Sequence, residues 1–209
     1  NRIPLTMHVG ESREEAEFFR RPGSPLALWL EEKSGVQWNL PSTDPITHAA
    51  RIGLWKSAAQ AVHMNLARPG HLPLLPRARA RIAYCPHSHE YFRHPRFPLE
   101  MFLSKGYCVA LGTDGLVSND GLSMFGELRL AHKLHPKVPL ETLWDMATAA
   151  GAKSLGYPRG GRLQKGFDAD VIGIPAGRTR HPLQQALEFR GKVPFLALDG
   201  KIVFRPPNC

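Results

Sequence analysis

Four side chains that can bind a metal or move a proton follow short apolar runs of this sequence. His8 and Glu11 lie in the segment Leu-Thr-Met-His-Val-Gly-Glu. His63 follows Ala-Val, and Asp114 follows the apolar run of residues 107–111. Imidazole and carboxylate groups together suit a divalent transition metal, and zinc with an open coordination position is the common catalytic arrangement. Such a metal would activate water, and Glu11 could carry a proton to a substrate nitrogen.

The elements that must position these residues alternate between strands and helices. Strands are predicted at residues 3–9, 58–64, 81–85 and 107–111, and helices between them favour a parallel sheet with crossover connections. In a (β/α)8 barrel the carboxyl ends of the strands meet at one mouth, where active sites are found. The histidines and Asp114 each lie near the end of a different predicted strand, so this fold would bring them together.

Capping signals place the helices. Ser12-x-x-Glu15 is a capping box that starts a helix running toward Arg20, and Gly35 ends a second helix over residues 24–34. Apolar periodicity and the glycine at position 106 predict further helices at residues 48–57, 99–105, 122–131 and 140–150.

The pattern changes near residue 158. A turn-rich connector over residues 160–166 precedes short apolar strands at 170–174 and 197–204, and Asp199-Gly200 is a hairpin turn signal. We therefore expect a domain of βα repeats over residues 1–158 and a small β portion over residues 159–209.

Composition limits the classes of function. The chain has 209 residues, 43% of them hydrophobic, which is enough for one sizeable core. It has no apolar run of about 18 residues, so no membrane span is expected. The net charge of +9 would suit nucleic acid, but the basic residues are scattered. Their tightest cluster, at residues 77–81, is either a solvated helix end or a phosphate-binding patch. We expect neither a nucleic-acid nor a membrane partner.

The three cysteines are odd in number and far apart in the sequence. Cys85 and Cys108 lie in apolar, strand-like runs, where a small buried thiol is a simpler interpretation than a disulfide or a metal ligand. A reducing, cytoplasmic environment is therefore expected.

Each candidate residue also has an ordinary structural interpretation. A single strand histidine such as His8 or His63 is usually a satisfied core or surface residue. Asp114 precedes Gly115 and could be a turn aspartate, and Glu11 could be a first-turn carboxylate favoured by the helix dipole. The combination favours a functional site, because the same order of elements would deliver all four residues to one place.

Five segments of the chain match the motifs of a known family in the same order. They are His8-Val-Gly-Glu11, the run ending at His63, and residues 83–88, 111–130 and 149–170. In these segments the chain resembles the amidohydrolase superfamily, in its group of metal-dependent deaminases and chlorohydrolases. The match over residues 111–130 is the most specific, and the resemblance extends over nearly the whole chain.

The resemblance implies a fold. It assigns the five segments to strands five to eight of the family's barrel and to the exit into its small β-sandwich domain. The implied fold class is α/β, a partial TIM-type (β/α)8 barrel made of its carboxyl-terminal half, with part of the β-sandwich. The family's first-strand His-x-His pair, which supplies two metal ligands, is not found. His87-Ser-His89 has that spacing, but it stands at the seventh-strand position.

The resemblance also implies roles for the site residues. His8 and Asp114 would bind the metal, and Glu11 would transfer protons. Asp114 would also accept the proton of the attacking water, which His63 would orient. The metal would be zinc, with iron or manganese as alternatives. The substrate pocket would include His87, Ser118 and Asn119.

The implied reaction is metal-dependent hydrolysis of a non-peptide C–N bond. The substrate would be an aromatic amino-heterocycle of the purine, pyrimidine or nucleoside kind, which would be deaminated. Dehalogenation and amide hydrolysis at the same metal are alternatives. A further alternative is an inactive or incomplete half-barrel that needs the missing amino-terminal half. The expected partners are a small heterocyclic substrate and either a second copy of the chain or that missing half.

Overall fold

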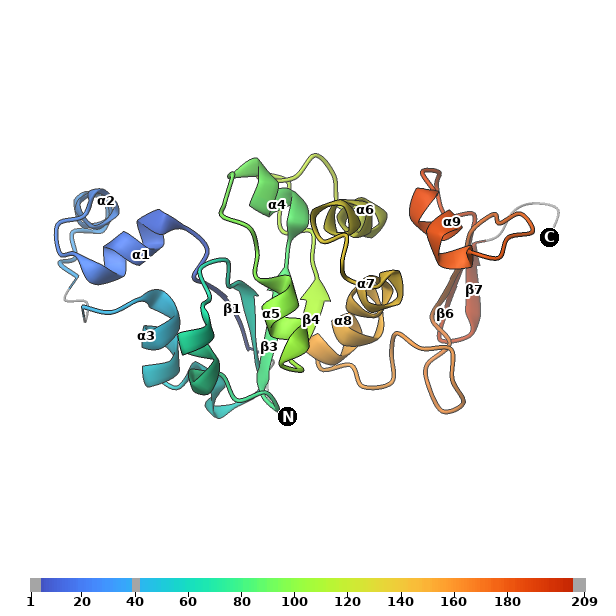
Figure 1. Cartoon of the computed structure of the whole chain (residues 1–209), viewed down its shortest axis with the longest axis horizontal. Helices are drawn as coiled ribbons and strands as arrows, with labels where there is room; N and C mark the ends of the chain where they lie inside the picture. Colours follow the sequence, from blue (N-terminus) through green and yellow to red (C-terminus); the bar gives the residue numbers. More distant parts are fainter. Residues whose placement is uncertain (1–4, 39–41, 205–209) are drawn as a thin grey trace. The chain divides into compact units, whose positions relative to one another are not determined.

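The computed structural model describes residues 5–38 and 42–204 of the chain. The backbone divides into two compact units, residues 1–84 with 89–108, and residues 85–88 with 109–209. Figure 1 labels many of the helices and strands of both units. Within the described ranges, we find no helix with the length and apolar character needed to cross a bilayer.

The first unit holds a parallel sheet of three strands, β1 (Leu5–Val9), β2 (Ala59–His63) and β3 (Ala80–Tyr84). β1 pairs with β2, and β2 pairs with β3. β2 and β3 are buried along most of their length, as expected for parallel strands that are covered on both faces. The three predicted strands are confirmed, although residues 3 and 4 of the first lie outside the described residues.

The first two helices begin and end at the expected signals. α1 (Arg13–Arg20) starts at Ser12, whose Oγ accepts a hydrogen bond from the backbone N–H of Glu15 at 3.1 Å. α2 (Pro25–Ser34) packs beside α1 (Figure 1) and ends at Gly35. Gly35 has a φ of 67°, a left-handed conformation that costs glycine little.

The next helices differ from prediction mainly at their ends. α3 (Pro45–Arg51) begins earlier than residue 48, because Asp44 caps it and proline is favoured in a first turn. The rest of the predicted segment holds the short 3-10 helix η1 (Leu54–Lys56). α5 (Leu99–Ser104) lies where it is predicted.

Between residues 69 and 91, two helical segments lie where the sequence predicts none. η2 (Pro69–Leu74) is a 3-10 helix in a proline-rich stretch, and α4 (Pro86–Tyr91) starts at the proline that ends a strand. Proline is tolerated in the first turn of a helix and cannot continue a strand ladder. Pro86 can therefore end the strand and begin the helix. Arg77 and Arg79 lie in the turn before β3 rather than at a helix end, and each donates a hydrogen bond to a backbone carbonyl.

β4 (Cys108–Leu111) is the fourth strand in chain order and leads into the second unit. α6 (Met124–Leu134) and α7 (Leu140–Ala147) follow and pack on each other. The helix predicted over residues 140–150 is interrupted at Thr148, whose φ and ψ of −123° and −92° are not helical, and α8 (Ala149–Ser154) continues after it.

A small antiparallel sheet ends the described chain. It contains β5 (Val171–Gly173), β6 (Phe195–Leu198) and β7 (Lys201–Phe204), in that order. Asp199 and Gly200 have φ values of 48° and 73°, the pair of positive values that a tight hairpin turn requires, so the predicted hairpin is confirmed. α9 (Pro182–Glu188) was not predicted and precedes β6 (Figure 1). The domain boundary at residue 158 stays a prediction.

The two cysteines of the strand-like runs differ in burial. Cys85 is buried and Cys108 is half-buried. Cys209 lies outside the described residues. Cys85 is therefore a small buried thiol, whereas Cys108 at the start of β4 is only partly covered.

Candidate active site

Three of the predicted site residues come together at the carboxyl ends of β1 and β2. One ligand atom from each of His8, Glu11 and His63 lies within 4.8 Å of the other two. The imidazoles of His8 and His63 meet edge to face, with ring centroids 4.8 Å apart. Nε2 of His63 is 3.6 Å from Oε1 of Glu11. Two imidazoles and a carboxylate so close together fit a divalent metal such as zinc.

The backbone at the end of β2 adopts an uncommon conformation. His63 and Met64 have φ values of 72° and 57°. A non-glycine residue in this left-handed region costs about 1–2 kcal/mol and persists only where the surroundings hold it. Both side chains are buried, and the Met64 N–H donates to the carbonyl of Val9 on the neighbouring strand at 3.0 Å. Packing and this hydrogen bond therefore hold the His63 imidazole beside His8.

Glu15 fixes the loop that carries Glu11. Its two carboxylate oxygens accept hydrogen bonds from the backbone N–H of Gly10 at 3.0 Å and of Glu11 at 2.7 Å. On the other side, Nδ2 of Asn65 donates to the carbonyl of Glu11 at 3.1 Å. The backbone of Glu11 is therefore held at both its N–H and its C=O. The capping-box pattern predicts the helix start, but it does not predict this second role of Glu15.

The environment of Glu15 makes stability depend on pH. Burial raises the pKa of its carboxyl above the ordinary 4.5, although the N–H groups of Gly10, Glu11 and Ser12 oppose this change. An acid with a raised folded-state pKa contributes stability below its unfolded pKa, and this contribution is lost as the pH rises through the folded value. Glu15→Gln has no titrating group at this position, so its stability should not show this pH-dependent loss. Above pH 4.5, the free energy of unfolding of the wild type should therefore fall relative to that of the variant.

Urea denaturation of both proteins across the acidic to neutral range measures this difference. Glu141→Gln, on the exposed surface of α7, is the control and should keep the wild-type pH dependence. Parallel stability curves for the wild type and Glu15→Gln would show that the proton affinity of Glu15 is the same in the folded and unfolded states.

His94 is a further residue at this cluster, and the motifs do not identify it. Its Nε2 lies 3.8 Å from Oε1 of Glu11, its side chain is 10% exposed, and Nε2 has no hydrogen-bond partner among the described residues. Two imidazoles, from His63 and His94, therefore approach one carboxylate. Glu11 and His94 also line a cavity of about 660 Å³ together with Phe92. No spacing rule identifies His94, because it reaches Glu11 only through the folded chain.

In the second unit, two serines orient Asp114. Its Oδ2 accepts hydrogen bonds from the hydroxyl groups of Ser88 at 2.7 Å and Ser118 at 2.9 Å. Both serines are buried. Asp114 has a φ of 54°, so this predicted site residue also has a left-handed backbone. The two hydroxyl donors fix the direction of the carboxylate.

Glu127 of α6 organises the loop that carries Asp114. It is fully buried, and its carboxylate accepts from Nδ2 of Asn119 at 2.6 Å and from the backbone N–H of His87 at 3.0 Å. Asn119 also donates to the carbonyl of Thr113 at 2.7 Å. The predicted pocket residues His87, Ser118 and Asn119 thus help to hold this loop, and their contact with substrate stays a prediction. A signal for Glu127 exists in the sequence, because it is a charged residue beside the apolar stripe of its helix.

Comparison with known proteins decides the family. Residues 1–203 match the family described as the Amidohydrolase family. The chain belongs to this family. This amidohydrolase is 26% identical over 215 residues to a 5-methylthioadenosine/S-adenosylhomocysteine deaminase of Carboxydothermus hydrogenoformans, a match that covers 96% of this chain and 46% of that protein.

Solved structures agree with this assignment. An aminofutalosine deaminase of Helicobacter pylori in complex with methylthio-coformycin matches with a TM-score of 0.81 and 26% identity, over 96% of this chain and 50% of that one. An adenosine deaminase of Xanthomonas campestris with bound zinc shares the fold, with a TM-score of 0.77 and 24% identity over 97% of this chain and 46% of that one. This amidohydrolase spans about half the length of the curated relatives it matches. The predicted superfamily and the α/β fold class of a partial TIM-type barrel are confirmed.

Proposed function

We propose that this amidohydrolase acts in the hydrolytic deamination of an aromatic amino-heterocycle, with release of ammonia. The cluster of His8, Glu11 and His63, with ligand atoms within 4.8 Å of one another, carries the proposal, because it joins metal-binding groups to an acid. Similarity to proteins named 5-methylthioadenosine/S-adenosylhomocysteine deaminase and aminofutalosine deaminase supports a substrate of the purine, pyrimidine or nucleoside kind.

The proposed metal ligands are His8 and Asp114, with zinc as the ion and iron or manganese as alternatives. When bound, such an ion lowers the pKa of a coordinated water to near 7 and so supplies hydroxide at neutral pH. Asp114, held by its two serine hydroxyls, accepts the proton of the attacking water. His63 orients this water, and its burial and strained backbone keep the imidazole in one position.

Glu11 is the proposed proton carrier. It protonates the ring nitrogen next to the reacting carbon and later the leaving amine. Its backbone is anchored by Glu15 and Asn65, so the carboxylate acts from a fixed place. Phe92 and Leu26 line the cavity next to Glu11 and offer apolar surface to a flat ring. His87, Ser118 and Asn119 are the proposed substrate residues of the second unit.

Ammonia release tests the proposed reaction. The protein expressed from its complete reading frame, loaded with zinc, is assayed with aminopurines, aminopyrimidines and their nucleosides, and with chloro and amide analogues as controls. We expect ammonia from at least one amino-heterocycle, loss of this activity after treatment with a chelator, and recovery when zinc is added back.

Other outcomes would contradict deamination. Chloride release without ammonia would indicate a dehalogenase, and metal-loaded protein inactive on the whole panel would argue against the reaction. The 209-residue chain is assayed in parallel. If it holds well below one metal per chain and is inactive while the complete protein is active, the site needs residues that this chain does not contain.

A further inference from the structure

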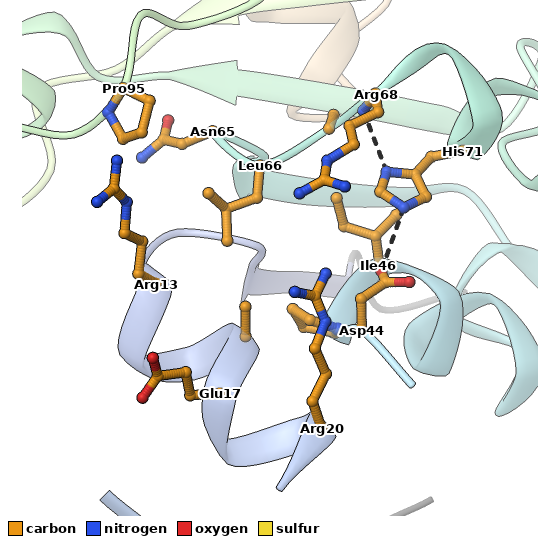
Figure 2. Close-up of a pocket in the computed structure, with 13 residues that line it drawn as sticks. Arg13, Glu17, Arg20, Asp44, Ile46, Asn65, Leu66, Arg68, His71 and Pro95 are labelled. Atoms are coloured by element: carbon orange, nitrogen blue, oxygen red, sulfur yellow. Dashed lines mark hydrogen bonds and ion pairs between the residues drawn. The ribbon is translucent and has the colours of Figure 1, made fainter. Parts of the chain in front are cut away.

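A second cavity lies beside α1, and the metal-binding cluster does not line it. Its volume is about 430 Å³, which is within the range of small-molecule pockets. One wall is a single face of α1, formed at helical spacing by Arg13, Ala16, Glu17 and Arg20 (Figure 2). The opposite wall is the segment from Asn65 to His71, which follows β2.

Three guanidinium groups surround this cavity. Arg13 and Arg20 stand at the two ends of the α1 face, about 10 Å apart along the helix axis. Arg68 belongs to the opposite wall, and Figure 2 shows Arg20 and Arg68 pointing toward each other while the Glu17 carboxylate points away. Within the described part of the chain, none of the three arginines forms an ion pair. Three unpaired positive charges around one hollow favour an anionic ligand.

The acidic residue at the base of the cavity is already satisfied. The Asp44 carboxylate accepts from the backbone N–H of Thr47 at 3.0 Å and from its hydroxyl at 2.6 Å, and it lies 3.4 Å from Nε2 of His71. Burial by itself would raise the pKa of Asp44, but the Thr47 hydrogen bonds and the nearby His71 outweigh it and hold that pKa below its ordinary value. Asp44 is therefore ionised, and its carboxylate is bonded to Thr47 and His71 and forms no ion pair with the arginines.

Apolar side chains form a further part of the cavity lining, which also includes Asn65 and His71. Ala16, Ile46 and Ala67 are buried, and Leu66 of the opposite wall is half-buried. The cavity volume is larger than a simple oxyanion needs, and these four side chains carry no polar group. The cavity therefore suits a ligand with an anionic group and an apolar body.

We propose that this cavity binds a small aromatic phosphate monoester. The phosphate lies between Arg20 and Arg68, and the aromatic body packs on Leu66 and Ile46. Guanidinium forks match phosphate oxygens in a bidentate manner. A phosphate monoester has three acceptor oxygens and nearly two negative charges, whereas a carboxylate has two oxygens and one charge. The two opposed guanidinium groups therefore suit the phosphate better. The site needs no metal, so it stands whether or not the protein is a deaminase.

Calorimetric titration of the 209-residue chain tests the site, with phenyl phosphate as the probe. Inorganic phosphate tests the phosphate group without a ring, and phenol tests the ring without a charge. Benzoate tests a ring that carries a singly charged carboxylate in place of the phosphate. We expect saturable binding of phenyl phosphate that is tighter than binding of the other three. Arg20→Gln and Arg68→Gln should each weaken it about tenfold, since each removes hydrogen bonds to a charged group.

Arg51→Gln is the matched control, because Arg51 is exposed at the end of α3 and does not line the cavity. It should leave the affinity for phenyl phosphate unchanged. If Arg51→Gln weakened phenyl phosphate binding as much as the two test variants do, the binding would reflect general attraction to a basic protein. That result would overturn the proposal. Absence of saturable binding, or benzoate bound as tightly as phenyl phosphate, would also overturn it. The two test variants lie on different walls, and thermal unfolding verifies that each is folded.

Discussion

Replacing Glu11 with glutamine is expected to lower kcat for ammonia release by about 10²- to 10⁴-fold, the usual contribution of a positioned proton carrier. The amide is nearly isosteric with the acid, but it cannot donate and regain a proton. The backbone of residue 11 remains bound to Glu15 and Asn65, so the loop should keep its shape. Steady-state kinetics of the complete protein, with the zinc content of each sample measured, would check this expectation.

The metal content of the Glu11→Gln variant separates two roles of this residue. One carboxylate oxygen of Glu11 lies close enough to His8 and His63 to be a metal ligand itself. Unchanged zinc with a low kcat supports the role in proton transfer, whereas zinc lost together with activity would make Glu11 a ligand. A variant with wild-type kcat would remove Glu11 from the mechanism. Glu141→Gln, the same chemical change on the exposed surface of α7, should leave both quantities unchanged.

The predictable parts of the fold are those that local chemistry determines. The buried strand β2 is rich in small apolar residues, α1 begins at a serine cap, and Asp199-Gly200 forms the turn that its residue types favour. α4 was missed because Pro86 is a strand terminator and also an acceptable first residue of a helix. The break at Thr148 was missed because the apolar spacing continues across it.

The predictable parts of the site are those that depend on strand ends. His8, Glu11 and His63 were found because each stands at or just after a strand that ends at the same edge of the sheet. The approach of His94 to Glu11 depends on contacts between segments far apart in the sequence, which no local pattern encodes. The same holds for the cavity beside α1. The spacing of Arg13 and Arg20 places them on one helix face, but the position of Arg68 opposite them comes only from the fold.

Removing a proposed metal ligand should have the largest effect on metal binding. We expect Asp114→Asn and His8→Ala each to weaken zinc affinity by more than about 100-fold and to abolish turnover, because even the loss of a group that only orients a ligand costs about 10- to 100-fold. Ser88→Ala, which removes one of the two hydroxyl donors to Asp114, should fall in that smaller range. Competition for zinc with a chromophoric chelator measures all three affinities.

Asp120→Asn is the control for Asp114→Asn, because it makes the same change at an exposed position of the same loop, and it should keep wild-type affinity. The relative size of the effects separates a ligand from a positioning residue. If Ser88→Ala weakens zinc binding less than Asp114→Asn, the serine acts through the aspartate, as their 2.7 Å hydrogen bond implies. If Asp114→Asn binds zinc as tightly as the wild type, Asp114 is not a ligand, and the cluster of His8, Glu11 and His63 would be the metal site of this chain.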